Sequence, residues 1–348
     1  MFQPDYRHFA EVMKNKRPAR LPLYEHYINA PFMERLMEHK FAHLAGGNEA
    51  DRDEYLRQIG RFFKTMTYDV ISYEVCITDI LPGHGALLGG MPGPIQNRAD
   101  FKAYPWADLP RIYMDYAFPF FDSLERTLPE GMKAVGGIGN GVFEISEDLV
   151  GMEYLPYMQV DDPELYADVF NGIGEMMFQI WSKFLARYKH NFVACRFGDD
   201  LGFKASLLTN PDTIRSQVLP QYKRVIDLIH SHGCPFLWHS CGCIFEIMED
   251  VVALGIDAKH SNEDVISSYD RWIRDYSSRI ALVGGFDLGF LCQSDEATVY
   301  NTVLKEGARF RAACRGYALG SGNSIPDYVP VENYRAMCRA AQTIRDQE

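Results

Sequence analysis

The chain of 348 residues lacks the features that mark secreted and membrane proteins. Its first twenty residues contain no continuous apolar stretch of the kind found in signal peptides. No run reaches the roughly 18 apolar residues that a membrane-spanning helix needs. We therefore expect a cytoplasmic protein with no membrane contact. Because disulfides are rare in that compartment, the eight cysteines are interpreted as free thiols or metal ligands.

Long runs of lysine and arginine are also missing, and the formal net charge is −12. Since nucleic-acid-binding proteins usually carry a basic patch, we expect no nucleic-acid partner. Hydrophobic residues make up 47% of the chain and charged residues 24%. This composition argues against intrinsic disorder and is sufficient for one large core.

Three common catalytic motifs are absent as well. The sequence contains no Walker loop, no G-x-G-x-x-G after a strand and no G-x-S-x-G turn. ATP-dependent, NAD-dependent and serine-hydrolase activities are therefore disfavoured.

Short β-prone runs alternate instead with longer helical patterns. The eight runs cover residues 21–25, 69–74, 133–138, 191–196, 235–240, 256–260, 280–285 and 317–320. Capping sequences such as Asp162-Pro163 and Asn210-Pro211 open the helices between them. This alternation predicts an α/β fold, a (β/α)8 TIM barrel in a single domain over residues 1–348, with a doubly wound open sheet as the alternative. The long segment at about residues 80–130 predicts an insertion after strand two.

Polar residues follow seven of the eight predicted strands. In a TIM barrel the carboxyl ends of the strands meet at one face, where active sites are built. The residues concerned are Tyr24, Glu25, His26, Tyr73, Glu74, Asp199, Asp200, His239, Cys241, Asn262, Asp287 and Asn323. Capping of the following helix explains Asp200, Asn262 or Asp287 equally well when each is taken alone. Their convergence on one face predicts an active site there.

The most specific local pattern is His239-x-Cys241. Residues i and i+2 of a strand face the same side, so both side chains can reach one ion. Imidazole and thiolate are the usual zinc ligands. The pattern predicts a metal site, and the alternative is a packed strand in which the histidine and cysteine are incidental. Cys243, just past Gly242, is a further candidate ligand.

Together these motifs resemble the uroporphyrinogen decarboxylase superfamily over nearly the whole chain. The similar segments are residues 17–22, 198–202, 219–223, 239–242, 255–257, 320–326 and 329–333. The resemblance implies a (β/α)8 barrel and one of two activities. One is cofactor-free decarboxylation of uroporphyrinogen, and the other is methyl transfer that involves a corrinoid. It also implies, for the transferases, zinc held by a His-x-Cys pair and a distant cysteine near strand eight.

The sequence departs from both branches of the superfamily. Decarboxylases carry an Arg-Gln-Ala-Gly-Arg run where this chain has residues 24–29, and Glu25 there would repel a polycarboxylate. The essential aspartate of the decarboxylases is matched only by Glu74. Ser321 replaces both the strand-eight histidine of the decarboxylases and the distant cysteine of the transferases. We therefore expect a transferase whose third zinc ligand is a carboxylate, with Glu74 and Asp199 as candidates.

The resulting hypothesis is a corrinoid-dependent methyltransferase of the O-demethylase type. It would move a methyl group from a small methylated substrate, such as a methoxylated aromatic, to the Co(I) corrinoid of a partner protein, with zinc as a Lewis acid. The metal ligands would be His239, Cys241 and Glu74, and the catalytic residues Glu74, Tyr73 and Asp199. The substrate-binding residues would be Tyr24, Glu25, His26, Asp200, Asn262, Asp287 and Asn323.

Two alternatives stay open at this point. One is a cofactor-free decarboxylase or lyase that acts on a different acid, with Glu74 and His239 as acid and base. The other is a non-catalytic barrel that binds a tetrapyrrole, because a fold does not fix a function. A homodimer is compatible with the sequence.

Overall fold

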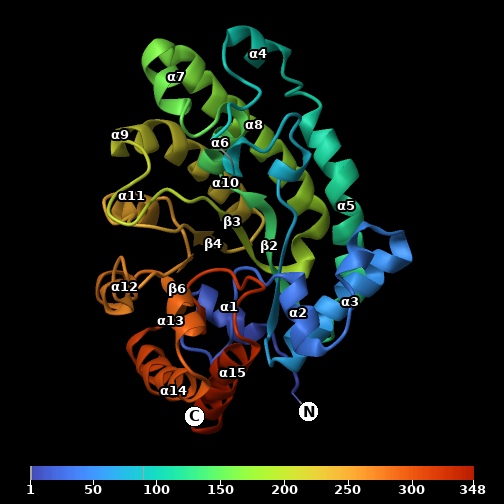
Figure 1. The fold of residues 1–348 in the computed structure, drawn as a ribbon, viewed down its shortest axis with the longest axis vertical. Helices are drawn as coiled ribbons and strands as arrows, with labels where there is room; N and C mark the ends of the chain where they lie inside the picture. The colour runs from blue at the N-terminus through green and yellow to red at the C-terminus, as the bar shows by residue number, and fades with distance from the viewer. Residues whose placement is uncertain (1, 89) are drawn as a thin grey trace.

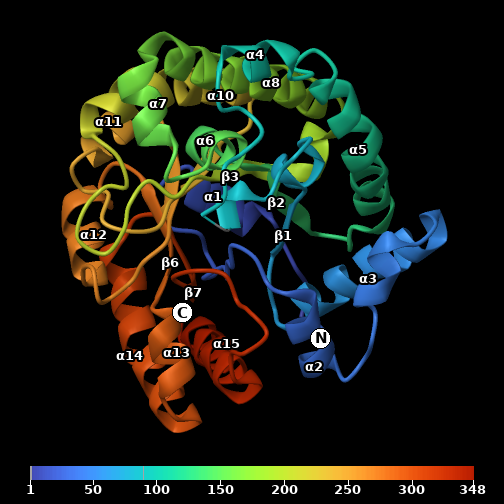
Figure 2. The same cartoon turned by 45° about the horizontal axis from the view of Figure 1, so that its top comes forward.

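A computed structural model describes residues 2–88 and 90–348. Seven strands follow one another in sequence order around one curled sheet (Figures 1 and 2). They are β1 (Val70–Glu74), β2 (Lys133–Asn140), β3 (Phe192–Gly198), β4 (Phe236–His239), β5 (Ala258–His260), β6 (Ala281–Phe286) and β7 (Tyr317–Ser321). Neighbouring strands are parallel, as helical connections between successive strands require.

The predicted first strand, residues 21–25, is not a regular strand but fills the eighth position of the barrel. Leu23 pairs with Leu319 of β7 in a parallel bridge. On the other side, the Ser72 hydroxyl of β1 donates to the Glu25 carbonyl. Pro22 has no N–H to give to a ladder, which accounts for the short pairing. The predicted TIM barrel is confirmed, with an irregular eighth segment.

Helices surround the sheet, as Figure 2 shows. The α-helices are α1 (Arg7–Met13), α2 (Ala30–Met37), α3 (Glu49–Thr65), α4 (Arg98–Ala103), α5 (Leu109–Thr127), α6 (Val142–Val150), α7 (Leu155–Asp161), α8 (Pro163–Tyr188), α9 (Pro211–Thr213), α10 (Leu219–Ser231), α11 (Met248–Ala253), α12 (Tyr269–Tyr276), α13 (Leu288–Gln293), α14 (Glu296–Ala313) and α15 (Val331–Asp346). A π-helical turn, η5 (Ile214–Val218), joins α9 to α10, and 3-10 turns are η1 (Ala42–Gly46), η2 (Thr78–Ile80), η3 (Ala86–Leu88) and η4 (Lys189–Asn191). Two predicted caps are present: Asp162 accepts from the Leu165 amide over 3.1 Å and Asn210 from the Asp212 amide over 2.8 Å.

Apolar side chains form two separate clusters, as expected of a closed barrel. The larger cluster lies between the strands and the outer helices. The smaller one fills the barrel interior with residues such as Val70, Val135, Leu237 and Ala318, and Phe9 of α1 packs against them. The interior is therefore a packed core, and only its carboxyl-terminal end is available for a site.

The segment between β1 and α5 is the predicted insertion. It contains η2, η3 and α4, and it ends where α5, a regular barrel helix, begins at Leu109. Asp148 of α6 accepts from the amides of Gly85 and Leu87, and Asn140 at the end of β2 accepts from Thr78. The insertion thus packs on the face that carries the strand ends. Among the described residues, none of the helices is both long and apolar enough to cross a membrane.

Candidate active site

The predicted histidine and cysteine lie together inside the barrel mouth, although only the histidine belongs to a strand. His239 ends β4 and pairs in register with His260 of β5 on one side and Gly198 of β3 on the other. Cys241 follows two residues later, and its sulfur lies 3.4 Å from Nε2 of His239. The predicted proximity of His239 and Cys241 is therefore present.

Asp200 completes a group of three potential metal ligands. Its Oδ1 lies 3.8 Å from Nε2 of His239 and accepts from the Cys241 amide over 2.8 Å. The ligand atoms of Asp200, His239 and Cys241 all lie within 4.8 Å of one another. A tetrahedral zinc ion would hold a nitrogen about 3.6 Å from a sulfur and about 3.3 Å from an oxygen. The observed spacing fits such an ion after a small movement of the Asp200 side chain.

Burial sets the protonation of this group in the absence of metal. It raises the pKa of the Cys241 thiol, and Asp200 adds to that shift. It also lowers the pKa of His239 well below the ordinary range, so the imidazole is neutral. A cation at this position would reverse the first effect, because a coordinated thiol is deprotonated.

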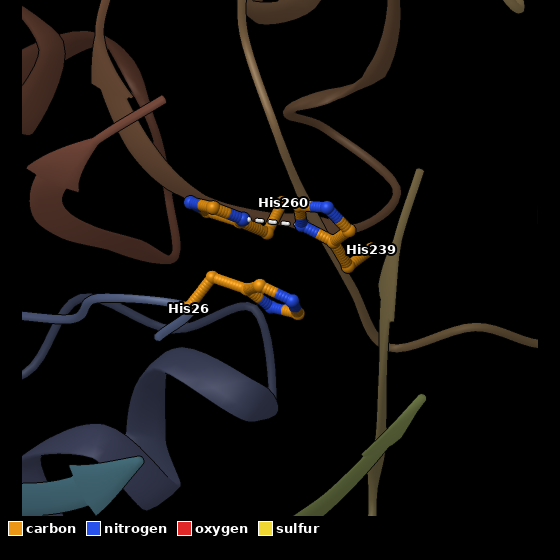
Figure 3. Close-up of side chains that lie close together, drawn as sticks. All are labelled: His26, His239 and His260. Atoms are coloured by element: carbon orange, nitrogen blue, oxygen red, sulfur yellow. Dashed lines mark hydrogen bonds between the residues drawn. The ribbon is translucent and has the colours of Figure 1, made fainter. Parts of the chain in front are cut away.

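A second group, His26, His239 and His260, has the right atoms but the wrong orientation for a metal. Figure 3 shows the three rings lying against one another. The His26 and His239 rings stack with centroids 3.6 Å apart and planes 14° apart. Their lone pairs therefore lie in nearly parallel planes, and an ion about 2.0–2.1 Å from both nitrogens would be out of at least one ring plane. Nδ1 of His239 and Nδ1 of His260 are already 2.8 Å apart in a hydrogen bond.

Glu74, the sequence-based choice of third ligand, belongs to neither group. It forms an ion pair with Arg196 of β3, whose Nε lies 3.2 Å from Oε2. The same guanidinium donates to the Tyr24 hydroxyl over 2.7 Å and to the His26 carbonyl over 2.6 Å. Glu74, which is partly exposed to the cavity described below, balances the charge of the fully buried Arg196, and Asp200 is the carboxylate that lies beside the His239–Cys241 pair.

A cavity of about 520 Å³ opens beside this ion pair. Its aromatic lining consists of Tyr27, Tyr55, Tyr73, Tyr116 and Phe120. Glu74 and Asp79 are its acidic lining residues, and none of the described residues that line it is lysine or arginine. His26 also lines the cavity, and the same imidazole stacks on His239. The cavity therefore suits an uncharged aromatic ligand better than a polycarboxylate.

Several of the predicted site residues have structural partners. Asp199 is buried and accepts from the Phe143 and Glu144 amides at the start of α6 and from the Tyr222 hydroxyl. Asp287 caps α13 through the Phe290 amide over 3.0 Å.

Glu25 is fully buried and accepts from the amide and hydroxyl of Ser321. These contacts place it beneath the surface of the barrel mouth. Burial raises its pKa to about 8.

Asn262 and Asn323 lie near the strand ends where they were predicted. Asn323 Nδ2 is 3.5 Å from the sulfur of Cys241. Asn262 is buried, and its Oδ1 has no hydrogen-bond partner among residues 2–88 and 90–348. The backbone just before Asn262 is strained at Ser261, a non-glycine residue with φ of 106°, whose hydroxyl donates to Cys241 over 3.4 Å.

The structure adds acidic residues that sequence reasoning missed. Glu144 of α6 accepts from the Asp200 amide over 3.3 Å and from Asn140 Nδ2 over 3.0 Å. Burial, together with Asp199 and Asp200, raises the pKa of Glu144 well above its ordinary value and that of Glu147 to about 8. Both carboxyls can therefore hold a proton near the candidate metal group. Neither follows a strand directly, so the strand-end rule could not find them.

Comparison with known proteins identifies the family. A family model described as Uroporphyrinogen decarboxylase (URO-D) matches residues 90–344. A methyltransferase from Methanosarcina mazei superimposes with a TM-score of 0.75 at 14% identity, covering 99% of each chain. At that identity the likeness shows the fold alone. No curated protein matches the chain.

Two glycoside hydrolases are more distant. PbGH5A from Prevotella bryantii B14 has a TM-score of 0.44 at 10% identity, covering 98% of this chain and 99% of that chain. An endo-beta-1,4-xylanase from Gloeophyllum trabeum has a TM-score of 0.41 at 10% identity, covering 66% and 80%. Both likenesses are too low to bear on function. Because the family model spans most of the sequence, this chain belongs to the uroporphyrinogen decarboxylase family.

Proposed function

We propose that this chain is a zinc-dependent methyltransferase that moves a methyl group from a small methylated substrate to the Co(I) corrinoid of a partner protein. The observation that carries the proposal is the convergence of Asp200, His239 and Cys241 at the barrel mouth. Donors of this type and spacing suit zinc. The similarity in fold to a methyltransferase is compatible with this reading.

The aromatic cavity supports a methoxylated aromatic as the methyl donor. Its tyrosine and phenylalanine side chains offer ring-stacking contacts, and its described lining provides no cation to bind a carboxylate. The same feature weighs against decarboxylation of a polyacid, which needs basic residues for its charged arms. The His26 imidazole would contact the substrate in the cavity, and the same ring stacks on His239.

Asp200, His239 and Cys241 would hold the zinc, which would supply Lewis-acid polarisation of an ether oxygen. The methyl group would pass to the Co(I) corrinoid of the partner as co-substrate: the carbon–oxygen bond would break with its electron pair left on the oxygen, and the electron pair of Co(I) would form the new bond. The oxygen then needs a proton. Glu144, whose pKa is raised above its ordinary value by burial, and Tyr73 in the cavity wall are the candidate donors.

Arg196 and Glu74 would hold the shape of the site rather than take part in the reaction. The guanidinium is tied to the His26 carbonyl and to the Tyr24 hydroxyl. It thereby fixes the segment that carries His26, while Glu74 balances its charge. This assignment replaces the expectation that Glu74 binds the metal.

Metal analysis of three purified proteins tests the proposal. We expect one zinc per chain in the wild type, loss of zinc in Asp200→Asn, and retention in Glu74→Gln. Asparagine has the size of aspartate, but its amide oxygen is a weaker zinc ligand than a carboxylate oxygen. Glutamine at position 74 can still accept a hydrogen bond from Arg196. Retention in Asp200→Asn together with loss in Glu74→Gln would reverse the ligand assignment.

Activity is measured by mixing the zinc-loaded protein with a methoxylated aromatic and free cob(I)alamin and following the cobalamin spectrum. Consumption of Co(I) that depends on the aromatic supports the function. A protein that holds no zinc and shows no cobalamin dependence would instead favour a cofactor-free decarboxylase or lyase.

A further inference from the structure

A chain of hydrogen bonds runs behind His239, away from the candidate metal group. His260 connects to His239 through the two Nδ1 atoms, 2.8 Å apart, as the dashed line in Figure 3 shows. On its far side, Nε2 of His260 lies 3.0 Å from the backbone carbonyl of Ser321. His260 is fully buried, so water does not compete for these bonds.

The carbonyl at the end of this chain fixes where the protons lie. A carbonyl oxygen only accepts, so Nε2 of His260 must carry a proton. If Nδ1 of His260 also carried one, the ring would be a buried cation whose hydrogen-bond partners are neutral, which is costly. Nδ1 of His260 therefore accepts, and Nδ1 of His239 donates.

The position of the Ser321 carbonyl is itself determined by its surroundings. The Ser321 amide donates to Glu25 over 3.0 Å, which orients the end of β7. Gly284 lies beside it with φ of +91°, and a Cβ there would be 2.4 Å from the Ser321 oxygen and 2.9 Å from Nε2 of His260. A larger residue at position 284 would therefore displace the hydrogen bond.

We propose that His260 is a positioning residue that sets the tautomer of His239, so that Nε2 of His239 presents its lone pair toward Cys241 and Asp200. A metal ligand nitrogen must be unprotonated, and a hydrogen bond to the other nitrogen is the usual means of fixing it. His26 makes no hydrogen bond to His239 and contributes by ring stacking alone. This inference rests on the proposed metal site for its purpose, but the tautomer can be measured without metal.

The first experiment is nitrogen NMR on the full-length, metal-free protein labelled with ¹⁵N-histidine. We expect His239 to carry its proton on Nδ1 and His260 on Nε2. Resonances are assigned by their loss in His239→Asn and His260→Phe. A wild-type protein in which His239 carries its proton on Nε2 would overturn the proposal, whether or not zinc binds.

The second experiment measures zinc affinity in competition with a chromophoric chelator. His260→Phe keeps a ring but removes the acceptor, and we expect zinc to bind about 10–100-fold more weakly. His260→Asn places an oxygen acceptor near the position of Nδ1, so we expect most of the affinity to return. His26→Phe is the matched control, since it retains a stacked ring, and its zinc affinity should stay within about threefold of wild type.

Equal affinities in wild type and folded His260→Phe would refute the role of His260. Equal losses in His260→Phe and His26→Phe would also refute it, because they would indicate general disturbance of the histidine cluster. If no variant, including the wild type, binds zinc, the proposed metal function fails, and the NMR result alone then decides the tautomer.

Discussion

Replacing Arg196 by methionine should destabilise the fold severely. The side chain is fully buried and donates to Glu74, to the Tyr24 hydroxyl and to the His26 carbonyl. Methionine preserves much of the apolar stem but leaves the Glu74 carboxylate without its cation. Arg196 is fully buried and Glu74 is largely buried, and removal of one partner from such a pair costs about 3–5 kcal/mol.

The expected change in melting temperature follows from the size of the protein. For 348 residues the entropy of unfolding is about 0.7 kcal/mol per kelvin, so this loss lowers Tm by about 4–7 °C. Differential scanning calorimetry at one scan rate measures the change. Arg224→Met is the control, because Arg224 and its partner Glu175 are both exposed and such a pair contributes about 0–1 kcal/mol.

A double variant separates charge from packing. Adding Glu74→Gln to Arg196→Met removes the carboxylate that has lost its cation. The free energy of unfolding of the double variant should therefore be at least about 1 kcal/mol higher than that of Arg196→Met alone. The reasoning is refuted if Arg196→Met is no more harmful than Arg224→Met, or if the second substitution brings no recovery.

Three further predictions concern the residues around the site. Burial raises the pKa of Glu25 to about 8 from an unfolded value near 4.5, so between these pH values the folded state holds a proton that the unfolded state has lost. The free energy of unfolding should therefore fall as the pH rises through that window, by up to about 1.4 kcal/mol per pH unit. Urea titrations should show a smaller slope in Glu25→Gln, and an unchanged slope would contradict the burial of a protonated Glu25. Asp199→Ala should lose about 0.5–2 kcal/mol of stability, because the substitution removes the acceptor for the first amides of α6. The variant should keep its zinc, and loss of zinc from the folded variant would mean that Asp199 is a metal ligand. Ser261→Gly should gain about 1 kcal/mol in thermal unfolding, because glycine adopts a positive φ without strain, and a loss would mean that the hydroxyl contact with Cys241 outweighs the strain.

Much of the barrel followed from local patterns in the sequence. The β-prone runs from 69–74 to 317–320 lie where the seven strands form, because burial on both faces selects continuous apolar segments. Caps such as Asp162 and Asn210 act through residues two or three positions away, so the sequence alone could locate the helix starts. The exception is the segment 21–25, where Pro22 shortens the pairing that its apolar pattern predicts.

The sequence also predicted that His239 and Cys241 would lie side by side, and they do, although Cys241 lies beyond the end of β4 and the two-residue period of a strand does not extend to it. It could not choose the carboxylate beside them. Glu74 is the last residue of β1 and Asp200 follows β3, and only the tertiary structure showed that Arg196, on a strand two positions away from β1 in the barrel, pairs with Glu74. The partnership of His260 with His239 likewise depends on the register between β4 and β5. Contacts of this kind are decided by packing between distant segments, which no local period encodes.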